Sequence, residues 1–230
     1  MKQSIRIPIL FEDDDIIVVN KPAGMIVHPA PGHETNTLTD ALKAHCPAIA
    51  KVGSISRPGV VHRLDTGTSG VMVFAKTRAA YLNLREQFES HMTVRKIYLA
   101  VLHGAPKPPT GMVNAPIGKK PWDPKRMAIN GTDAKNAVSR YQLLAKRGKL
   151  AIVEFRIATG RTHQIRVHAA FLGHPIVGDD LYGDSTLDAK LATRPTHPLL
   201  HAIKLSFIHP KTNERVTFAA PPPAEILYAG

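Results

Sequence analysis

Residues 60–77 read VVHRLDTGTSGVMVFAKT, a short polar loop that leads directly into a strongly apolar strand. Asp65 is the only carboxylate in this stretch. Gly67 and Gly70 permit tight backbone conformations, so residues 66–70 are interpreted as a turn. A polar loop on a rigid strand is a common place for catalytic residues. Because Asp-Thr-Gly also closes turns through hydrogen bonds of the Asp side chain, Asp65 has both a structural and a chemical interpretation.

Residues 62–77, HRLDTGTSGVMVFAKT, resemble the catalytic motif of the RluA-type pseudouridine synthases, which isomerise uridine within structured RNA. Residues 12–29, EDDDIIVVNKPAGMIVHP, resemble the family's opening strand and turn, and residues 160–183, GRTHQIRVHAAFLGHPIVGDDLYG, resemble its later Arg-containing motif. The resemblance therefore covers nearly the whole chain. Many relatives carry an N-terminal S4-type RNA-binding domain, for which residues 1–8 leave no room. We therefore expect residues 1–230 to form a single catalytic domain without an S4 domain.

Apolar alternation predicts strands over residues 16–20, 71–76, 96–102, 138–145, 150–158, 200–208 and 215–218. Helices are predicted over residues 37–45, 77–92 and 162–172, and the basic connection 146–149 predicts an antiparallel hairpin. Runs of strands with few helices favour an α+β fold over a doubly wound parallel sheet. The resemblance implies a mixed, largely antiparallel, bent central sheet with flanking helices and loops. Residues 105–109 and 118–130 are interpreted as loops.

The composition indicates a polyanionic partner. Thirty Lys and Arg against eighteen Asp and Glu give a formal charge of +12. Cys46 is the only cysteine, so no disulfide can form within the chain. The N-terminal residues lack the apolar run of a signal peptide, and no segment is apolar enough to cross a bilayer, so we expect a cytoplasmic protein with no membrane association. The twelve histidines show no metal-ligand spacing, and no metal is expected.

Asp65 is the candidate for the central chemical group. Conversion of uridine to pseudouridine breaks the bond between N1 and C1′ and rejoins the base through C5, without redox change, so no cofactor is expected. A carboxylate could attack C1′, balance positive charge on the sugar, or remove a sugar proton. The sequence leaves these three roles open.

The resemblance implies two catalytic partners for Asp65. Arg161, in the GRTHQ segment, matches the arginine that pairs with the family's aspartate and would hold the carboxylate ionised. Tyr98, in RKIYL, matches the active-site tyrosine. Its ring would stack on the uracil, and its hydroxyl could help remove the C5 proton.

Further residues are assigned by the same resemblance to substrate binding or support. Ile165 would form part of the pocket wall, and Arg63 would assist as the nucleotide flips out of the RNA. His62 has either a direct role or a structural one in the turn. Lys21 and Pro22 are expected to support the active-site loop, and Arg166 is expected to contact phosphate or lie on the surface.

The expected partner is a stem-loop of ribosomal or transfer RNA, bound by a monomer. Two alternatives stay open at this point. A noncatalytic RNA-binding protein would explain the charge but would leave Asp65, Tyr98 and Arg161 without a purpose. A glycosidase-like hydrolase would use Asp65, although such enzymes usually employ two carboxylates, and no second one lies in a comparable motif.

Overall fold

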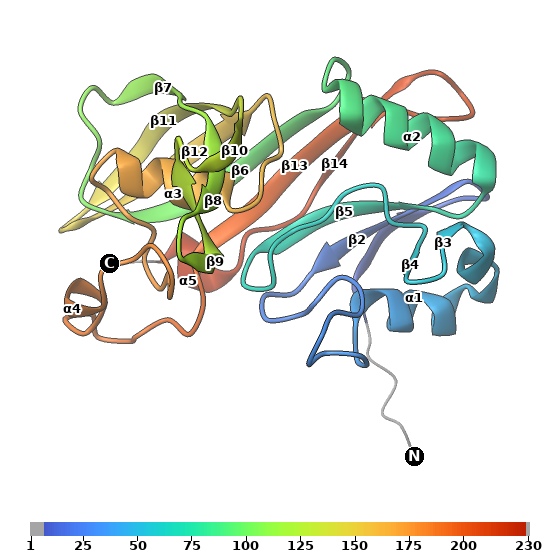
Figure 1. The fold of residues 1–230 in the computed structure, drawn as a ribbon, viewed down its shortest axis with the longest axis horizontal. Coiled ribbons are helices and arrows are strands. Elements are labelled where there is room, and N and C mark those ends of the chain that lie inside the picture. Colours follow the sequence, from blue (N-terminus) through green and yellow to red (C-terminus); the bar gives the residue numbers. More distant parts are fainter. Residues whose placement is uncertain (1–6, 229–230) are drawn as a thin grey trace. The chain divides into compact units, whose positions relative to one another are not determined.

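The computed structural model describes residues 7–228, an α+β chain with mostly antiparallel strands and few helices (Figure 1). These residues divide into two compact units. The first unit contains residues 7–95 and 202–221, and the second contains residues 96–201 and 222–228. No helix in the described range is long and apolar enough to span a membrane. Two segments that lie far apart in the sequence, residues 7–95 and 202–221, thus make up the first unit.

The strands of the first unit lie in the order β1-β2-β5-β13, with β14 paired to β13. Their bounds are β1 (Ile9–Glu12), β2 (Ile16–Lys21), β5 (Ser69–Ala75), β13 (Leu200–Ile208, in this unit from Ala202 onward) and β14 (Arg215–Ala219). β2 and β5 pair antiparallel, and all seven residues of β5 are buried. These bounds confirm the strands predicted over residues 16–20, 71–76, 200–208 and 215–218. The continuous apolar run of β5 is typical of a strand that is covered on both faces.

The helices of the first unit confirm the predicted ones to within two residues. In α1 (Leu38–His45), Thr37 caps the N-terminus and forms a capping box with Asp40. Thr77 caps α2 (Arg78–Ser90), which buries Ala80, Leu84 and Phe88 on one face. A 3₁₀ helix (Pro47–Lys51) and a small hairpin, β3 (Gly53–Ser54) with β4 (Arg57–Pro58), follow α1.

The second unit contains the strand order β6-β12-β11-β7, in which every neighbouring pair is antiparallel. The bounds are β6 (Arg95–His103, in this unit from Lys96 onward), β7 (Thr110–Asn114), β11 (Val138–Arg147) and β12 (Leu150–Ile157). Gly148 and Lys149 join β11 to β12, which confirms the predicted hairpin. The helices are α3 (Gln164–Phe171), α4 (Ser185–Asp188) and α5 (Ala224–Leu227). Of these, α3 contacts β11.

The loop predicted over residues 118–130 is wrong. The segment forms two of the three strands of a small sheet, β8 (Ile117–Lys120), β9 (Asp123–Ile129) and β10 (Thr132–Lys135), in the order β10-β8-β9. A Cβ at Gly118, within this predicted loop, would lie 2.4 Å from the Gly131 carbonyl oxygen. Glycine is therefore needed here because two backbones pack closely, which is a known use of glycine within strands.

Candidate active site

Asp65 lies in the first unit, in the loop that precedes β5. Leu64 is buried at 7% exposure, whereas Arg63 is exposed and Asp65 is half-buried. The Asp65 carbonyl oxygen accepts a hydrogen bond from the Thr68 N–H at 3.0 Å, which closes a turn. The apolar Leu64 side chain thus anchors the loop while the neighbouring carboxylate keeps access to solvent.

Lys21, at the end of β2, is fully buried and supports this turn from below the surface. Its ammonium group donates to the carbonyl oxygens of Pro22 at 3.0 Å, Met25 at 2.7 Å and Thr66 at 3.0 Å. Three donors therefore meet three acceptors. Burial lowers the pKa of Lys21 to about 7, and the charge of Asp65 opposes that shift. The expected supporting role of Lys21 agrees with these contacts.

Two more contacts hold the loop in place. The Val73 N–H donates to Nε2 of His62 at 3.1 Å, and the His62 ring stacks on Phe88 with centroids 4.3 Å apart. Gly70 adopts a φ of +120°, and a Cβ at this position would lie 2.3 Å from the Ala202 carbonyl oxygen. Gly70 is therefore required by the close approach of β13. His62 has a structural role, and its direct role toward RNA stays a prediction.

The second unit positions the other predicted site residues. Tyr98 on β6 is 9% exposed and lies opposite Phe155 on β12. Ile165, in the first turn of α3, is 4% exposed. Arg161 lies in the connection between β12 and α3, where its side chain Nε donates to the Asn136 carbonyl oxygen at 3.0 Å. Asp65, Arg63 and His62 thus belong to the first unit, and Tyr98, Arg161 and Ile165 to the second.

Gln164 fixes the turn that carries Arg161. Its Oε1 accepts from the Arg161 N–H at 3.0 Å and from the Thr159 hydroxyl at 2.7 Å. Its Nε2 donates to the Val138 carbonyl oxygen and the Ser139 hydroxyl, each at 3.0 Å. Because every polar atom of this amide is used, Gln164 ties the turn to β11 without leaving an unpaired buried group. Sequence reasoning missed Gln164, because two of its partners, Val138 and Ser139, lie 26 and 25 positions away in the sequence.

Lys96 was also missed by sequence reasoning. It is 8% exposed on β6, and its ammonium donates to the Thr159 carbonyl oxygen at 3.1 Å. Burial lowers its pKa to about 8, and the nearby charge of Arg161 adds to the effect. The available signal was a lysine two positions before Tyr98 in an otherwise apolar strand, because residues two apart share one face of a strand.

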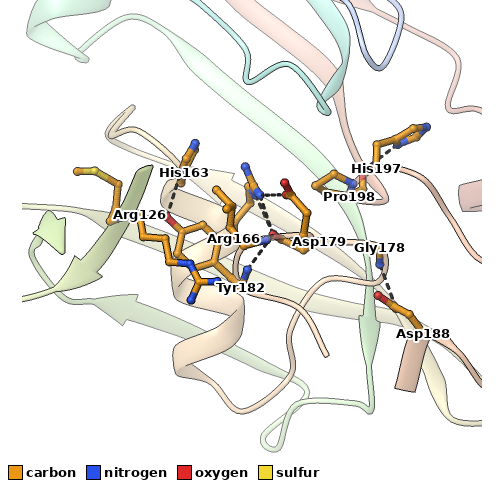
Figure 2. Close-up of polar contacts among 12 residues, drawn as sticks. Arg126, His163, Arg166, Gly178, Asp179, Tyr182, Asp188, His197 and Pro198 are labelled. Carbon is orange, nitrogen blue, oxygen red and sulfur yellow. Dashed lines mark hydrogen bonds and ion pairs between the residues drawn. The ribbon is translucent and has the colours of Figure 1, made fainter. Parts of the chain in front are cut away.

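The expectation that Arg166 contacts phosphate or lies on the surface is wrong. Arg166 is 5% exposed and forms a two-point ion pair with Asp179, with Nε–Oδ2 at 2.7 Å and Nη2–Oδ1 at 2.6 Å (Figure 2). Asp180 accepts a further hydrogen bond from Nη2 at 2.9 Å. Most arginines are exposed, but a planar guanidinium group matches a carboxylate well enough for the two to be buried together. Arg166 thus anchors the loop after α3.

His163 and His168, for which no metal-binding role was expected, both have hydrogen-bond partners within the protein. His163 adopts a left-handed conformation with φ of 57°, and its Nδ1 lies 2.8 Å from the Tyr182 hydroxyl (Figure 2). That hydroxyl also accepts from the Met127 N–H on β9 at 2.7 Å. His168 is fully buried, with Nδ1 at 2.9 Å from the Ser139 hydroxyl. Hydrogen bonds therefore hold α3 and its leading turn against β9 and β11.

The chemical capacity of these parts is clear within each unit. In the first unit, the half-buried Asp65 lies on a backbone that the buried Lys21 ammonium group holds in place. The second contains the buried Tyr98 ring, the buried Ile165 side chain and the half-buried Arg161. A held carboxylate can act as nucleophile or as a charge stabiliser, and an aromatic ring offers a stacking surface.

Comparison with known proteins gives concordant matches. The family model described as RNA pseudouridylate synthase matches residues 15–171. An RNA pseudouridine synthase of Synechocystis sp. is 45% identical over 224 residues, which is 96% of this chain and 67% of the relative. Ribosomal large subunit pseudouridine synthase D of Zymomonas mobilis is 41% identical over 231 residues, which is 97% of this chain and 72% of the relative. The solved structure titled human RNA Pseudouridylate Synthase Domain Containing 1 aligns with a TM-score of 0.77 at 28% identity, over 97% of this chain and 86% of that one.

Proposed function

Because this chain belongs to the RNA pseudouridylate synthase family, we propose that it isomerises specific uridines in structured ribosomal or transfer RNA, with Asp65 as the essential carboxylate. One observation carries the assignment of Asp65. Its carboxylate is half-buried on a turn whose backbone is held by Lys21 and anchored by Leu64. A group that must meet one sugar carbon in a fixed geometry requires such a support.

The reaction can be written from bond changes alone. The bond between N1 and C1′ breaks, the uracil turns within the site, and a new bond joins C5 to C1′. The hydrogen on C5 leaves as a proton and N1 gains one, so atoms balance without cofactor or water. Asp65 serves by attacking C1′, by stabilising positive charge on the sugar, or by taking a sugar proton.

The residues of the second unit are proposed to support Asp65. Arg161 would hold the carboxylate in its ionised form, which burial would otherwise disfavour. Tyr98 would stack on the detached uracil and assist removal of the C5 proton, and Ile165 would limit the movement of the base. The buried positions of Tyr98 and Ile165 support these roles, because a detached base has to be shielded from water.

RNA binding is proposed to combine charge with base flipping. A stacked uridine cannot be reached, so the nucleotide has to leave the helix. Arg63 is exposed beside Asp65 and could pair or stack where the base has left, and His62 would support that loop. Exposed lysines on the small β8–β10 sheet could also contact RNA phosphates. They are Lys119, Lys120, Lys125 and Lys135.

The names of the relatives suggest which RNA to propose as the substrate. The name of the Zymomonas relative specifies the large ribosomal subunit, so a stem-loop of large-subunit RNA is the first target to test. We further propose that the two units work together as one catalytic domain of a cytoplasmic monomer.

A tritium-release assay on RNA labelled at C5 of uridine tests the function. Release of tritium with the base retained in the RNA is the result expected of a synthase. Free uracil would instead support a glycosidase-like hydrolase, and binding with no reaction on ribosomal or transfer RNA would support a noncatalytic RNA-binding protein. The Asp65→Asn variant is the control for contaminating activity.

A further inference from the structure

Lys96 is a buried lysine next to the backbone that leads into Arg161. Its ammonium donates to the Thr159 carbonyl oxygen at 3.1 Å, two residues before Arg161. A Cβ placed on Gly160 would lie 3.4 Å from the Lys96 Nζ, so the ammonium also borders the residue between them. Lys96 thus contacts this turn from the side of β6.

Gln164 holds the same turn from the side of α3. Its Oε1 bridges the Thr159 hydroxyl and the Arg161 N–H, at 2.7 Å and 3.0 Å. The Val138 N–H on β11 adds a hydrogen bond to the Thr159 hydroxyl oxygen at 3.1 Å. The backbone from Thr159 to Arg161 is therefore fixed by donors and acceptors from three separate elements.

The location of Lys96 is costly for a residue that only fills space. Removing an ammonium from water is unfavourable, and a second cation nearby increases the cost. Burial and the charge of Arg161 together lower the Lys96 pKa to about 8. A leucine or methionine would fill the same volume without this cost, whereas neither could donate to the Thr159 carbonyl oxygen.

We propose that Lys96 is a positioning residue, which together with Gln164 fixes the Thr159–Arg161 turn and so sets where the Arg161 guanidinium points. The inference rests on the proposed role of Arg161. Lys96 acts through Arg161, so its effect falls on the chemical step and not on RNA affinity. A displacement of a catalytic group by about 1 Å is enough to slow an enzyme by about a hundredfold.

The test is a double-mutant cycle with Lys96→Met, Arg161→Met and the double variant, using tritium release to measure kcat and KM. Lys96→Met should lower kcat by between about tenfold and a hundredfold while KM stays within about twofold. In the Arg161→Met background, the same change should cost less than about twofold, because the residue it acts through is gone. Lys149→Met, an exposed lysine of the same unit, is the matched control and should have no effect.

The outcomes separate this inference from the proposed function. A normal kcat in Lys96→Met, or losses that multiply in the double variant, would overturn the positioning role while leaving Asp65 and Arg161 in place. Normal turnover in Arg161→Met would overturn the role of Arg161 itself, and with it this inference. If Lys96→Met does not fold by circular dichroism, Gln164→Met replaces it in the same cycle with the same expectations.

Discussion

The Lys21 ammonium donates a hydrogen bond at 3.0 Å to the carbonyl oxygen of Thr66, the residue that follows Asp65. A buried cation thereby fixes the backbone next to the carboxylate, and the charge of Asp65 in turn favours the protonated form of Lys21. The two residues come from β2 and from the loop before β5, which are neighbours because those strands pair. The pairing of two core strands thus determines the position of the Asp65 loop.

Replacing Asp65 with Asn should abolish pseudouridine formation while folding and RNA binding are retained. The exchange keeps the size and most hydrogen bonds of the side chain but removes its charge. We expect turnover to fall by at least about a hundredfold, measured by tritium release, with an unchanged Kd in a filter-binding assay. Turnover above that level would exclude Asp65 as the essential group.

Replacing Lys21 with Met should make the stability difference from the wild type depend on pH. Burial lowers the folded-state pKa of Lys21 from 10.5 to about 7, so between these values the unfolded chain binds the proton and the folded chain does not. The wild-type free energy of unfolding, relative to Lys21→Met, should therefore rise with pH across this window, by at most about 1.4 kcal/mol per pH unit. Below about pH 7 the difference should level off.

Urea denaturation at a series of pH values measures this difference, with the exposed Lys51→Met as control. A gap that stays constant between about pH 7 and pH 10 would show that the Lys21 pKa is not lowered in the folded state.

Much of the fold was predictable because its main elements carry strong local patterns. The apolar run of β5 and the spacing of Leu84 and Phe88 in α2 mark buried surfaces directly in the sequence. The β8–β10 sheet was missed because its strands are rich in lysine and contain Gly118. Glycine is needed at this position because the backbone of Gly131 packs closely against it. Such a contact depends on a strand elsewhere in the chain.

The surroundings of the candidate site were predictable only in part, for a related reason. Motifs pointed to Asp65, Tyr98 and Arg161, but the residues that hold them have partners distant in sequence. Lys96 contacts Thr159, which is 63 positions away. The burial of Arg166 depends on its ion pair with Asp179. Lysine and arginine are normally exposed, so burial of either cannot be read from the sequence until the partner is known.

Replacing Tyr98 with Phe tests the hydroxyl separately from the ring. The ring should still stack on the base, so RNA affinity should stay the same. Loss of the hydroxyl should slow removal of the C5 proton by about a hundredfold or more, seen as slower tritium release. Normal release would limit Tyr98 to stacking, and a lower melting temperature would assign the hydroxyl to stability. Tyr141→Phe, a tyrosine on β11 in the same unit, is the matched control.

Replacing both Lys120 and Lys125 with Gln should weaken RNA binding. Both are exposed on the β8–β9 hairpin. Each phosphate contact that is lost reduces the number of counterions released on binding. The plot of log K against log salt should become shallower by up to about 2, while kcat at saturating RNA is unchanged. The exposed lysines Lys51 and Lys204 of the first unit provide the matched double variant. Equal losses in both variants would indicate that total charge, and not this hairpin, sets affinity.

The close fit between Gly70 and the Ala202 backbone has a consequence for the order in which the protein is made. The Asp65 loop and β5 leave the ribosome long before residues 202–221, which supply β13 and β14. A growing chain therefore contains the whole Asp65 loop before it contains the strand against which Gly70 packs. The loop gains its last support only near the end of synthesis, and a chain interrupted before Ala202 would contain Asp65 in an unfinished unit.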